Sequence, residues 1–527
     1  MPQVDLTGGA LMSKGREQWG TKLGVILAVA GSAVGLGNFL RFPTQAALGG
    51  GGAFMIPYLV SFLLLGIPLM WVEWSLGRTG GEYGHGTAPA ILYRITGSRF
   101  IKYFASIGII IPLLILFYYA FIESWSLAYA FFSVSGALTE AAGKNELADF
   151  LRGYQGVVSN QYFDSMWLAY GFFVVTIIVN FYFIYKGVSS GIEKLSRIAM
   201  PILVVIAILL VGRILTLGTP DPLKPDQSVV NALNFVWTPD FSVLFESRVW
   251  LSAAGQIFFT LSLGMGVIMT YASYLKKSDD IALSGLTASA TNEFCEVILG
   301  GSLVIPAAFI FFGQIQTVQI AQSGSFNIGF VTMPNIFANM PGGPFFACLW
   351  FILLFIAGIT SSVSMIQPAV AFLEDEFGFS RKKTVLIMFA LTFLACQPVI
   401  FFMKYGFLDE LDFWGGTVFL TIFATLEIVV FGWIYGIDKG WKDLNEGAEI
   451  KIPSIFRFII KYISPLFLFI LLGTWTYQMF IPTIMMKGVP EENRPYIWGA
   501  RIFILAIIGV MMYLIKITTE KRPEVSK

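Results

Sequence analysis

The feature that most constrains this chain is an apolar segment of membrane-spanning length, residues 24–42, that is interrupted by glycines. It has the sequence GVILAVAGSAVGLGNFLRF, and Gly31, Gly35 and Gly37 fall in its middle. Glycine weakens a helix, and in hydrocarbon an unpaired backbone N–H or C=O group costs several kcal/mol. We therefore expect the segment to unwind at bilayer depth, with its freed backbone groups buried in protein or lining a cavity.

A second apolar segment, residues 251–274, is interrupted in the same way. Its residues 259–266 have the sequence FTLSLGMG and again place glycines inside a span. Interrupted segments in corresponding positions of two halves of a chain are typical of secondary transporters, whose substrates bind where the helices unwind. The two segments therefore predict one binding site shared between them.

The composition indicates an integral membrane protein built of helices. Hydrophobic residues make up 56% of the 527 residues and charged residues 13%, whereas about 25% of a soluble domain is charged. The apolar runs are continuous, while the strands of a membrane barrel alternate over about 10 residues. We predict an all-α membrane protein with 12 transmembrane helices.

The distribution of lysine and arginine predicts the orientation, because cytoplasmic loops carry an excess of both. Placing the amino terminus inside puts Lys14, Lys102, Lys194 and most other basic loop residues on the cytoplasmic side. We therefore expect a multi-pass protein of the cell (inner) membrane with both termini in the cytoplasm.

The order of the spans indicates an internal repeat. Spans 1–5 and 6–10 begin on opposite sides of the membrane, and each set opens with an interrupted helix, as in a 5+5 inverted repeat with two appended helices. The predicted parts are a cytoplasmic segment (1–19), the first repeat (20–215), an extracellular loop (216–247), the second repeat (248–436), spans 11 and 12 (437–518) and a cytoplasmic tail (519–527). Three longer connections, residues 135–163, 216–247 and 313–341, fall on the outside.

The broken helix ends carry charge, about half an elementary charge each, positive at an amino end and negative at a carboxyl end. The amino ends suit a carboxylate and the carboxyl ends suit a cation, so a zwitterionic amino acid satisfies both. Sodium takes several oxygen ligands, which Asn38, Thr260, Asn292, Thr360 and Ser361 offer in otherwise apolar spans. For any single one of these side chains, a hydrogen bond between helices is the alternative.

Two carboxyl groups are expected at bilayer depth, where a charge costs at least about 2.5 kcal/mol on insertion scales. Glu296 lies one helical turn after Asn292 and would supply fixed negative charge beside a sodium ion, and Glu73 is the second such residue. A structural, hydrogen-bonded carboxyl group is the alternative for both.

Several strings of the sequence resemble the sodium-coupled neurotransmitter symporter family, most closely its bacterial leucine transporters. They are GSAVGLGNFLRFP (31–43), GGGAFMIP (50–57), IESW (122–125), GQIFFTLSLG (255–264), TYASY (270–274), LSGL (283–286), TSS (360–362), FLEDE (372–376) and DFW (412–414). Their order and spacing follow the family along nearly the whole chain.

The resemblance implies a substrate site of eleven residues. These are Ala33, Gly35, Gly37, Ile115, Tyr119, Phe259, Thr260, Ser262, Met265, Ser361 and Met365. The chain departs from the bacterial leucine transporters at Ile115, Met265 and Met365, where the substrate side chain is expected. The site stays apolar there, and leucine, methionine and an aromatic amino acid all remain open as the preferred substrate.

The resemblance also implies two sodium sites and two gates. The first sodium is expected at Ala33, Asn38, Thr260 and Asn292 together with the substrate carboxylate, and the second at Gly31, Val34, Ala357, Thr360 and Ser361. The gating residues are Arg16, Trp19, Arg41, Gln256, Tyr274, Asp375 and Asp412, with Arg41–Asp412 as the outer pair and Arg16–Asp375 as the inner pair. Chloride-dependent relatives carry a small polar residue in place of Glu296, so chloride independence is expected.

The sequence thus predicts a symporter and not an enzyme. Its expected partners are sodium ions, a hydrophobic L-amino acid and the lipid bilayer, with no nucleic acid, and both a monomer and a homodimer are open. A sensor of the same fold that binds the amino acid without coupled transport is the alternative. A channel would require a continuous hydrated pore in place of gates at both mouths.

Overall fold

The computed structural model describes residues 17–521 and is built almost entirely of helices. The β pairing among these residues is one isolated bridge between Gly51 and Pro239. Within this described range ten helices are long and apolar enough to cross a membrane, and the bent pair of residues 22–33 and 36–48 makes an eleventh span. The all-α membrane architecture expected from the composition is therefore confirmed.

The first span breaks where the sequence predicts. α1 (Lys22–Ala33) is followed by α2 (Leu36–Phe39) and α3 (Arg41–Leu48), which continue it after a bend of 57°. Gly31 was expected to take part in the break but lies inside α1. A Cβ at Gly31 would come within 3.3 Å of the Cβ of Thr360, so this glycine permits a close approach between two helices.

The second interrupted span consists of α14 (Ser247–Thr260) and α15 (Val267–Ala272). In the connecting segment the backbone φ angle is 54° at Ser262 and 69° at Gly266, a region that residues other than glycine seldom adopt. A Cβ at Gly266 would also lie 2.4 Å from the carbonyl oxygen of Gly108. With this pair counted as a span, the structure is consistent with the twelve spans expected.

The remaining spans are continuous or contain only short π-helical and 3₁₀ turns. Their α-helices are α4 (Met55–Ser61), α5 (Ile67–Glu82), α7 (Arg99–Phe104), α8 (Ile107–Ser135), α11 (Trp167–Tyr185), α12 (Lys194–Leu215), α16 (Ala282–Glu293), α17 (Gly301–Phe312), α21 (Gly343–Phe377), α22 (Arg381–Phe402), α23 (Phe407–Asp412), α24 (Leu420–Val429), α25 (Ile437–Asn445), α26 (Ile455–Phe458), α27 (Ser464–Trp475), α28 (Ile481–Ile484) and α29 (Arg494–Lys521). The most apolar stretch of the span that contains α8 is 94% buried, against 22% for that of α29. α8 is therefore central and α29 peripheral.

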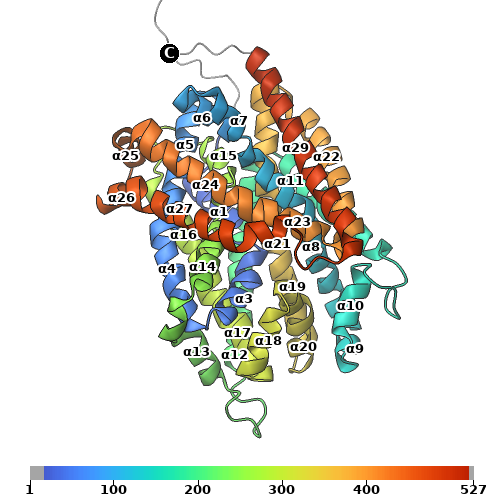
Figure 1. Ribbon diagram of the computed structural model, residues 1–527. Helices are drawn as coiled ribbons and strands as arrows, with labels where there is room; N and C mark the ends of the chain where they lie inside the picture. The colour runs from blue at the N-terminus through green and yellow to red at the C-terminus, as the bar shows by residue number, and fades with distance from the viewer. Residues whose placement is uncertain (1–16, 522–527) are drawn as a thin grey trace, which may run out of the picture.

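Each of the three long connections contains helices. They form α9 (Ala137–Gly143), α10 (Leu147–Tyr154), α13 (Val229–Trp237), α18 (Gln314–Gln322), α19 (Ser325–Asn327) and α20 (Met333–Ala338). Ring contacts hold α10 against α8: the centre of the Phe150 ring lies 5.9 Å from that of Tyr129 and 5.3 Å from that of Phe132. In Figure 1 α9, α10, α13, α18 and α20 gather at the end of the molecule away from the C-terminal end of α29.

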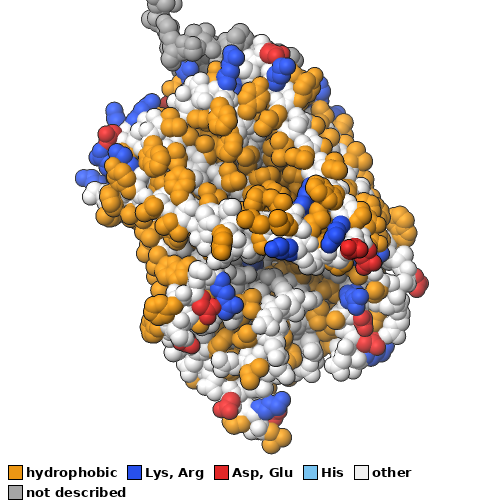
Figure 2. All heavy atoms as spheres, in the orientation of Figure 1, with side chains coloured by type: hydrophobic (Ala, Val, Ile, Leu, Met, Phe, Trp, Pro, Cys, Tyr) orange, Lys and Arg blue, Asp and Glu red, His pale blue; other side chains and the backbone are white. Residues whose placement is uncertain are grey.

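The outer surface carries the apolar side chains that a lipid environment requires. Leu505 and Ile502 of α29 are exposed, as are Leu466 and Ile470 of α27. In Figure 2 hydrophobic side chains cover much of the face over these helices. A large exposed apolar surface marks an interaction site. On helices that are long enough to span a membrane, such a surface faces the lipid.

Candidate binding site

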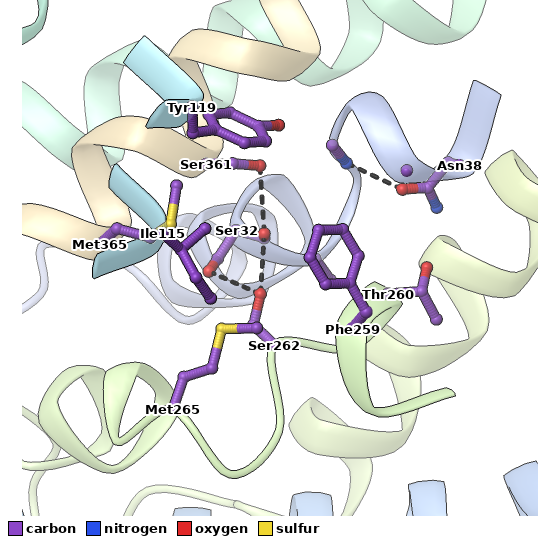
Figure 3. Close-up of a pocket in the computed structure, with 13 residues that line it drawn as sticks. Ser32, Asn38, Ile115, Tyr119, Phe259, Thr260, Ser262, Met265, Ser361 and Met365 are labelled. Atoms are coloured by element: carbon purple, nitrogen blue, oxygen red, sulfur yellow. Dashed lines mark hydrogen bonds between the residues drawn. The ribbon is translucent and has the colours of Figure 1, made fainter. Parts of the chain in front are cut away.

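A pocket lies where the breaks of the two interrupted spans face α8 and α21 (Figure 3). All eleven residues predicted for the substrate line it, together with Ser32 and Asn38. The space left between the side chains is about 30 Å³. The site residues predicted from four separate stretches of sequence are therefore brought together by the fold.

Hydroxyl groups form one wall of the pocket. The Ser262 hydroxyl donates to the carbonyl oxygen of Ser32 (2.9 Å), and the Ser361 hydroxyl donates to the same oxygen (3.2 Å). Ser32 also bonds through its own hydroxyl to Ser364 (2.8 Å). Ser32 was missed in the sequence, although a hydroxyl group beside a helix break was a usable signal.

One side of the pocket also carries apolar side chains. Figure 3 shows Ile115, Met265 and Met365 on one side of the pocket, with Asn38 and Thr260 on the other. Methionine is unbranched and flexible and fills irregular space. The pocket thus separates a polar region at the helix breaks from a region that adapts to an apolar group.

The start of α2 is held by two side chains. The backbone N–H of Gly35 donates to Oδ1 of Asn38 (2.8 Å), and that of Leu36 donates to the hydroxyl oxygen of Tyr119 (3.0 Å). Because the Tyr119 oxygen accepts, its own hydrogen remains able to point to an acceptor. Tyr119 thereby couples α8 to the break.

Three of the residues expected at the first sodium site are linked by hydrogen bonds through Asn292. Nδ2 of Asn38 donates to Oδ1 of Asn292 (2.8 Å), and Nδ2 of Asn292 donates to Oγ1 of Thr260 (3.0 Å). All three side chains are buried. Neutral oxygens from α2, α14 and α16 therefore converge beside the break, where Ala33 ends α1.

Glu296 stands next to this cluster and is fully buried. It accepts hydrogen bonds from Gln256 (2.5 Å), Tyr58 (3.0 Å), Asn292 (3.2 Å) and the hydroxyl of Thr260. These four hydrogen bonds give the oxygens of the buried carboxylate the partners that they lose when it leaves water. Tyr58 was missed in the sequence, because nothing local marks its contact with a residue 238 positions away.

The second expected ion site lies between α1 and α21. The Ser361 hydroxyl is 3.5 Å from the carbonyl oxygen of Gly31, and the Thr360 hydroxyl donates to the carbonyl oxygen of Ala357 (3.2 Å). Val34 follows the last residue of α1, where backbone carbonyls lack helical partners. The five predicted residues thus line one contact between the two helices.

Hydrogen bonds to a buried glutamate hold α21 in place beside this site, and the sequence did not reveal them. Glu123 of α8 accepts hydrogen bonds from Ser362 (2.5 Å) and from Asn180 of α11 (3.0 Å). All three residues are buried. Their contact joins α8, α11 and α21 directly behind Ser361.

An open vestibule of about 300 Å³ lies above the pocket on the side of α18–α20. Arg41, Asp412, Tyr119 and Phe259 line it, and Tyr119 and Phe259 line the pocket as well. Within residues 17–521 no ion pair joins Arg41 to Asp412: the guanidinium of Arg41 lies 4.6 Å from the centre of the Phe259 ring, and Asp412 accepts a bond from Tyr118 (2.6 Å). The expected outer pair is therefore open here.

Gln256, predicted to shield the substrate, is fully buried and bonds to Glu296. Glu73 accepts a hydrogen bond from the backbone N–H of Gly264 (2.7 Å). This carboxyl group therefore holds the unwound segment between α14 and α15, which gives it a structural contact in the second break.

The opposite end of the pocket is closed. The indole N–H of Trp19 donates to the carbonyl oxygen of Tyr271 (2.9 Å), and its ring lies 5.2 Å from the Tyr271 ring and 6.4 Å from the Tyr274 ring. The Tyr274 hydroxyl accepts a bond from Gln367 (2.7 Å). Asp375 lies in α21 near this end, whereas its predicted partner Arg16 is outside the described residues.

An all-helical membrane protein with two interrupted spans around a shared pocket, open on one side and closed on the other, is a secondary transporter. The chain belongs to the sodium:neurotransmitter symporter family, whose model matches residues 16–149 and 161–520. It is thus a sodium-dependent symporter and not an enzyme, as the resemblance implied.

Individual relatives agree with this assignment. An uncharacterised sodium-dependent transporter of Methanocaldococcus jannaschii is 33% identical over 96% of this chain and 99% of its own length. The sodium-dependent serotonin transporter of Drosophila melanogaster is 27% identical over 86% of this chain and 75% of its own length. The crystal structure of MhsT in complex with L-phenylalanine superimposes with a TM-score of 0.74 at 28% identity, covering 87% of this chain and 100% of that one.

Proposed function

We propose that the chain is a symporter of hydrophobic L-amino acids that moves two sodium ions with each substrate by alternating access, without chloride. The observation that carries the proposal is that one pocket combines polar side chains and helix ends, with Asn38 and Thr260 at one side, and the apolar side chains of Ile115, Met265 and Met365 at the other. An amino acid with an apolar side chain matches both regions. The solved complex of MhsT with L-phenylalanine supports the same substrate class.

The polar region orients the substrate backbone. The Tyr119 hydroxyl accepts from Leu36, so it donates its own hydrogen to the substrate carboxylate beside Gly35 and Gly37. The carbonyl groups at the end of α1 and α14, near Ala33 and Phe259, carry partial negative charge and receive the ammonium group. An uncharged amino-acid derivative would lose one of these interactions.

The first sodium ion shares a ligand with the substrate. Asn292 lies within hydrogen-bond distance of both Asn38 and Thr260, these three residues supply side-chain oxygens, and Ala33 supplies its carbonyl oxygen. The carboxylate of the substrate completes the shell, because a small hard cation prefers several oxygen ligands. This shared carboxylate makes sodium and substrate binding mutually dependent.

The second sodium ion is proposed between α1 and α21. Thr360 and Ser361 give hydroxyl oxygens and Gly31, Val34 and Ala357 give carbonyl oxygens. An ion here holds α1 against α21. Its departure toward the cytoplasm would release α1 and open the end closed by Trp19.

Two coupling ions are favoured where strong accumulation of the substrate is needed. Each charge that crosses gains about 2.3 kcal/mol per 100 mV. At about 1.4 kcal/mol per tenfold, one ion supports roughly fiftyfold accumulation and two support roughly a thousandfold or more.

Glu296 takes the place of a bound chloride in this proposal. Its buried carboxyl group contacts Thr260 and Asn292, two of the proposed sodium ligands. A permanent negative charge at this position balances the ion without a second anion. Transport independent of chloride follows.

The orientation and repeat predicted from the sequence complete the proposal. The closed end, with Trp19 and the C-terminal end of α29, faces the cytoplasm, and the vestibule above Phe259 faces outward. The halves 20–215 and 248–436 form the inverted repeat in a cell (inner) membrane. Arg41 and Asp412 approach each other when the vestibule closes.

The decisive experiment is uptake of radiolabelled L-amino acids into proteoliposomes under an inward sodium gradient, with potassium as the control. Sodium-driven accumulation of leucine, methionine or an aromatic amino acid above equilibrium supports the proposal. Binding without accumulation would instead indicate the sensor, the alternative of a different functional class.

A further inference from the structure

A second cavity, of about 370 Å³, lies away from the substrate pocket at the end of the molecule where α29 finishes. It is bounded by α5, α6 (Ala88–Thr96), the segment after α15, and α25 with the π-helical turn before it. Four cations line it, namely Arg78, Arg94, Lys277 and Lys439. On the orientation proposed above this end faces the cytoplasm.

Two of the four cations are occupied by the protein itself. Lys277 lies 3.8 Å from carboxylate oxygens of both Glu82 and Glu446. Arg78 is almost fully buried and donates to the backbone carbonyl oxygens of Asp279 (2.7 Å), Glu446 (2.9 Å) and Asp443. Arg78 and Lys277 therefore build the floor of the cavity.

The carboxylates of the cavity are engaged as well. Glu82 and Glu446 pair with Lys277, and the carboxylate of Asp443 accepts a hydrogen bond from the hydroxyl of Tyr435. The lining therefore holds four cations and three carboxylates, a net charge of +1, and each of the three carboxylates has a partner within the protein.

Arg94 and Lys439 are different, since in the described part of the chain neither lies within ion-pair distance of a carboxylate. Each is instead positioned by a tyrosine ring that also lines the cavity: Arg94 lies 4.6 Å from the ring centre of Tyr83, and Lys439 lies 4.4 Å from that of Tyr435. Cation–π contacts hold a charge in place without neutralising it. The cavity thus offers two oriented positive charges.

The cavity borders the lipid-facing surface. Trp433 and Ile434, which directly precede Tyr435, are about half exposed. Figure 2 shows Lys and Arg side chains gathered over the region of α25, beside hydrophobic side chains. Basic pockets between helices at the cytoplasmic face bind the phosphate groups of anionic lipids.

We infer that this cavity binds a phosphate group, with Arg94 and Lys439 as its two contacts, and that the phosphate belongs to the headgroup of an anionic phospholipid. A soluble phosphate has the same chemistry and is distinguished by the test. The inference does not depend on which amino acid is transported, because none of the cavity residues lines the substrate pocket.

The test measures lipid binding to the purified, delipidated protein by native mass spectrometry and by thermal stability. Phosphatidylglycerol is titrated against phosphatidylcholine for wild type, Arg94→Gln, Lys439→Gln and the double variant. A cation near an anionic lipid surface contributes about fivefold in affinity, so each single variant is expected to weaken phosphatidylglycerol binding about fivefold and the double variant about 25-fold. Lys451→Gln, an exposed lysine after α25 and outside the cavity, is the matched control and keeps wild-type binding.

A second arm titrates inorganic phosphate against chloride at equal ionic strength in lipid-free detergent. Stabilisation by phosphate alone, lost in the double variant, would assign the site to a soluble phosphate. Equal phosphatidylglycerol binding by wild type and double variant, with no phosphate effect, would overturn the inference. A second double variant, Arg94→Lys with Lys439→Arg, keeps both positive charges. It should bind phosphatidylglycerol selectively, as wild type does. This variant tests the role of charge even if the double glutamine variant folds poorly.

Discussion

The side-chain amide of Asn38 donates a hydrogen bond of 2.8 Å to the side-chain oxygen of Asn292, which joins the break of the first span to α16. Asn292 donates in turn to Thr260 at the end of α14 (3.0 Å). The oxygens proposed for the first sodium ion therefore come from three helices that meet only in the folded pocket. Any change in the position of one helix alters the ligand set of the ion.

Removing this link is expected to weaken sodium coupling. Asn292→Ala deletes one ligand of the ion, and a hydrogen bond or ligand to a charged group is worth about 1.5–3 kcal/mol, which is about tenfold or more. The half-saturating sodium concentration for uptake should rise accordingly. Ser289→Ala is the control, because within residues 17–521 this buried hydroxyl on the same helix bonds to the carbonyl oxygen of Gly285 (3.0 Å) and to no ligand of the ion. An unchanged sodium dependence in Asn292→Ala would refute the assignment.

Replacement of Glu296 tests chloride independence. Wild-type uptake is expected to be equal in chloride and gluconate, whereas Glu296→Ser removes the fixed charge and leaves space, so its uptake should require chloride. Glu296→Gln is neutral but fills the same volume, and its lower uptake should not be restored by chloride. A chloride requirement in the wild type would contradict the role given to Glu296.

The same variants address a proton route through this buried carboxyl group. If Glu296 carried a proton outward, wild-type uptake would change with internal pH and that of Glu296→Gln would not. Uptake insensitive to internal pH in both proteins would exclude proton counter-transport at this residue.

The helix breaks could be predicted because their signal is local. A glycine cluster inside an apolar span has few physical explanations, and the breaks fall at Val34–Gly35 and between Thr260 and Val267. Polar residues in apolar spans likewise identified Asn38 and Asn292, since an amide in hydrocarbon requires a partner.

Other parts of the site could not be predicted because they depend on packing between distant spans. Tyr58 meets Glu296 across 238 positions, and the contact of Glu123 with Ser362 crosses 239. Gly31 was misplaced in the break because sequence does not distinguish a glycine that unwinds a helix from one that admits a neighbouring helix. The helical content of the outer connections was missed for the same reason, since α10 is held by the rings of α8.

The methionines of the pocket should set substrate size. The free volume of the pocket is only about 30 Å³. Met365→Ala is therefore expected to enlarge the pocket, so that it accepts substrates with the bulkiest side chains. A change of a few methylenes in an apolar pocket is worth about 1–3 kcal/mol, and the ratio of kcat/KM for tryptophan over leucine should rise about tenfold or more. Met388→Ala, buried in α22 outside the pocket, should leave the ratio unchanged. Equal ratios in both variants would place the substrate side chain elsewhere.

The indole of Trp19 is expected to stabilise the outward-facing state. Trp19→Ala removes its hydrogen bond to Tyr271 and both ring contacts. If the variant spends 90% of its time open inward, apparent substrate affinity falls about tenfold, which equilibrium binding at saturating sodium would measure. Trp19→Phe keeps the ring contacts and should lose less. An affinity equal to wild type in Trp19→Ala would show that the closed end does not depend on this residue.

Gly266 joins the second break to α8 and gives a test of the fold itself. Its φ of 69° costs about 1–2 kcal/mol for an alanine, and the added Cβ would lie 2.4 Å from the carbonyl oxygen of Gly108. Gly266→Ala should therefore lower the thermal stability of the purified protein and abolish substrate binding. Gly97→Ala separates the two effects, because Gly97 has a φ of 68° but no atom within 4 Å of the new Cβ, so it should show only the modest backbone cost. Gly212→Ala, inside α12 and also in open space, should be neutral or stabilising by up to about 1 kcal/mol. Equal stability losses in Gly266→Ala and Gly97→Ala would mean that the close approach of α8 contributes nothing to the shape of the break.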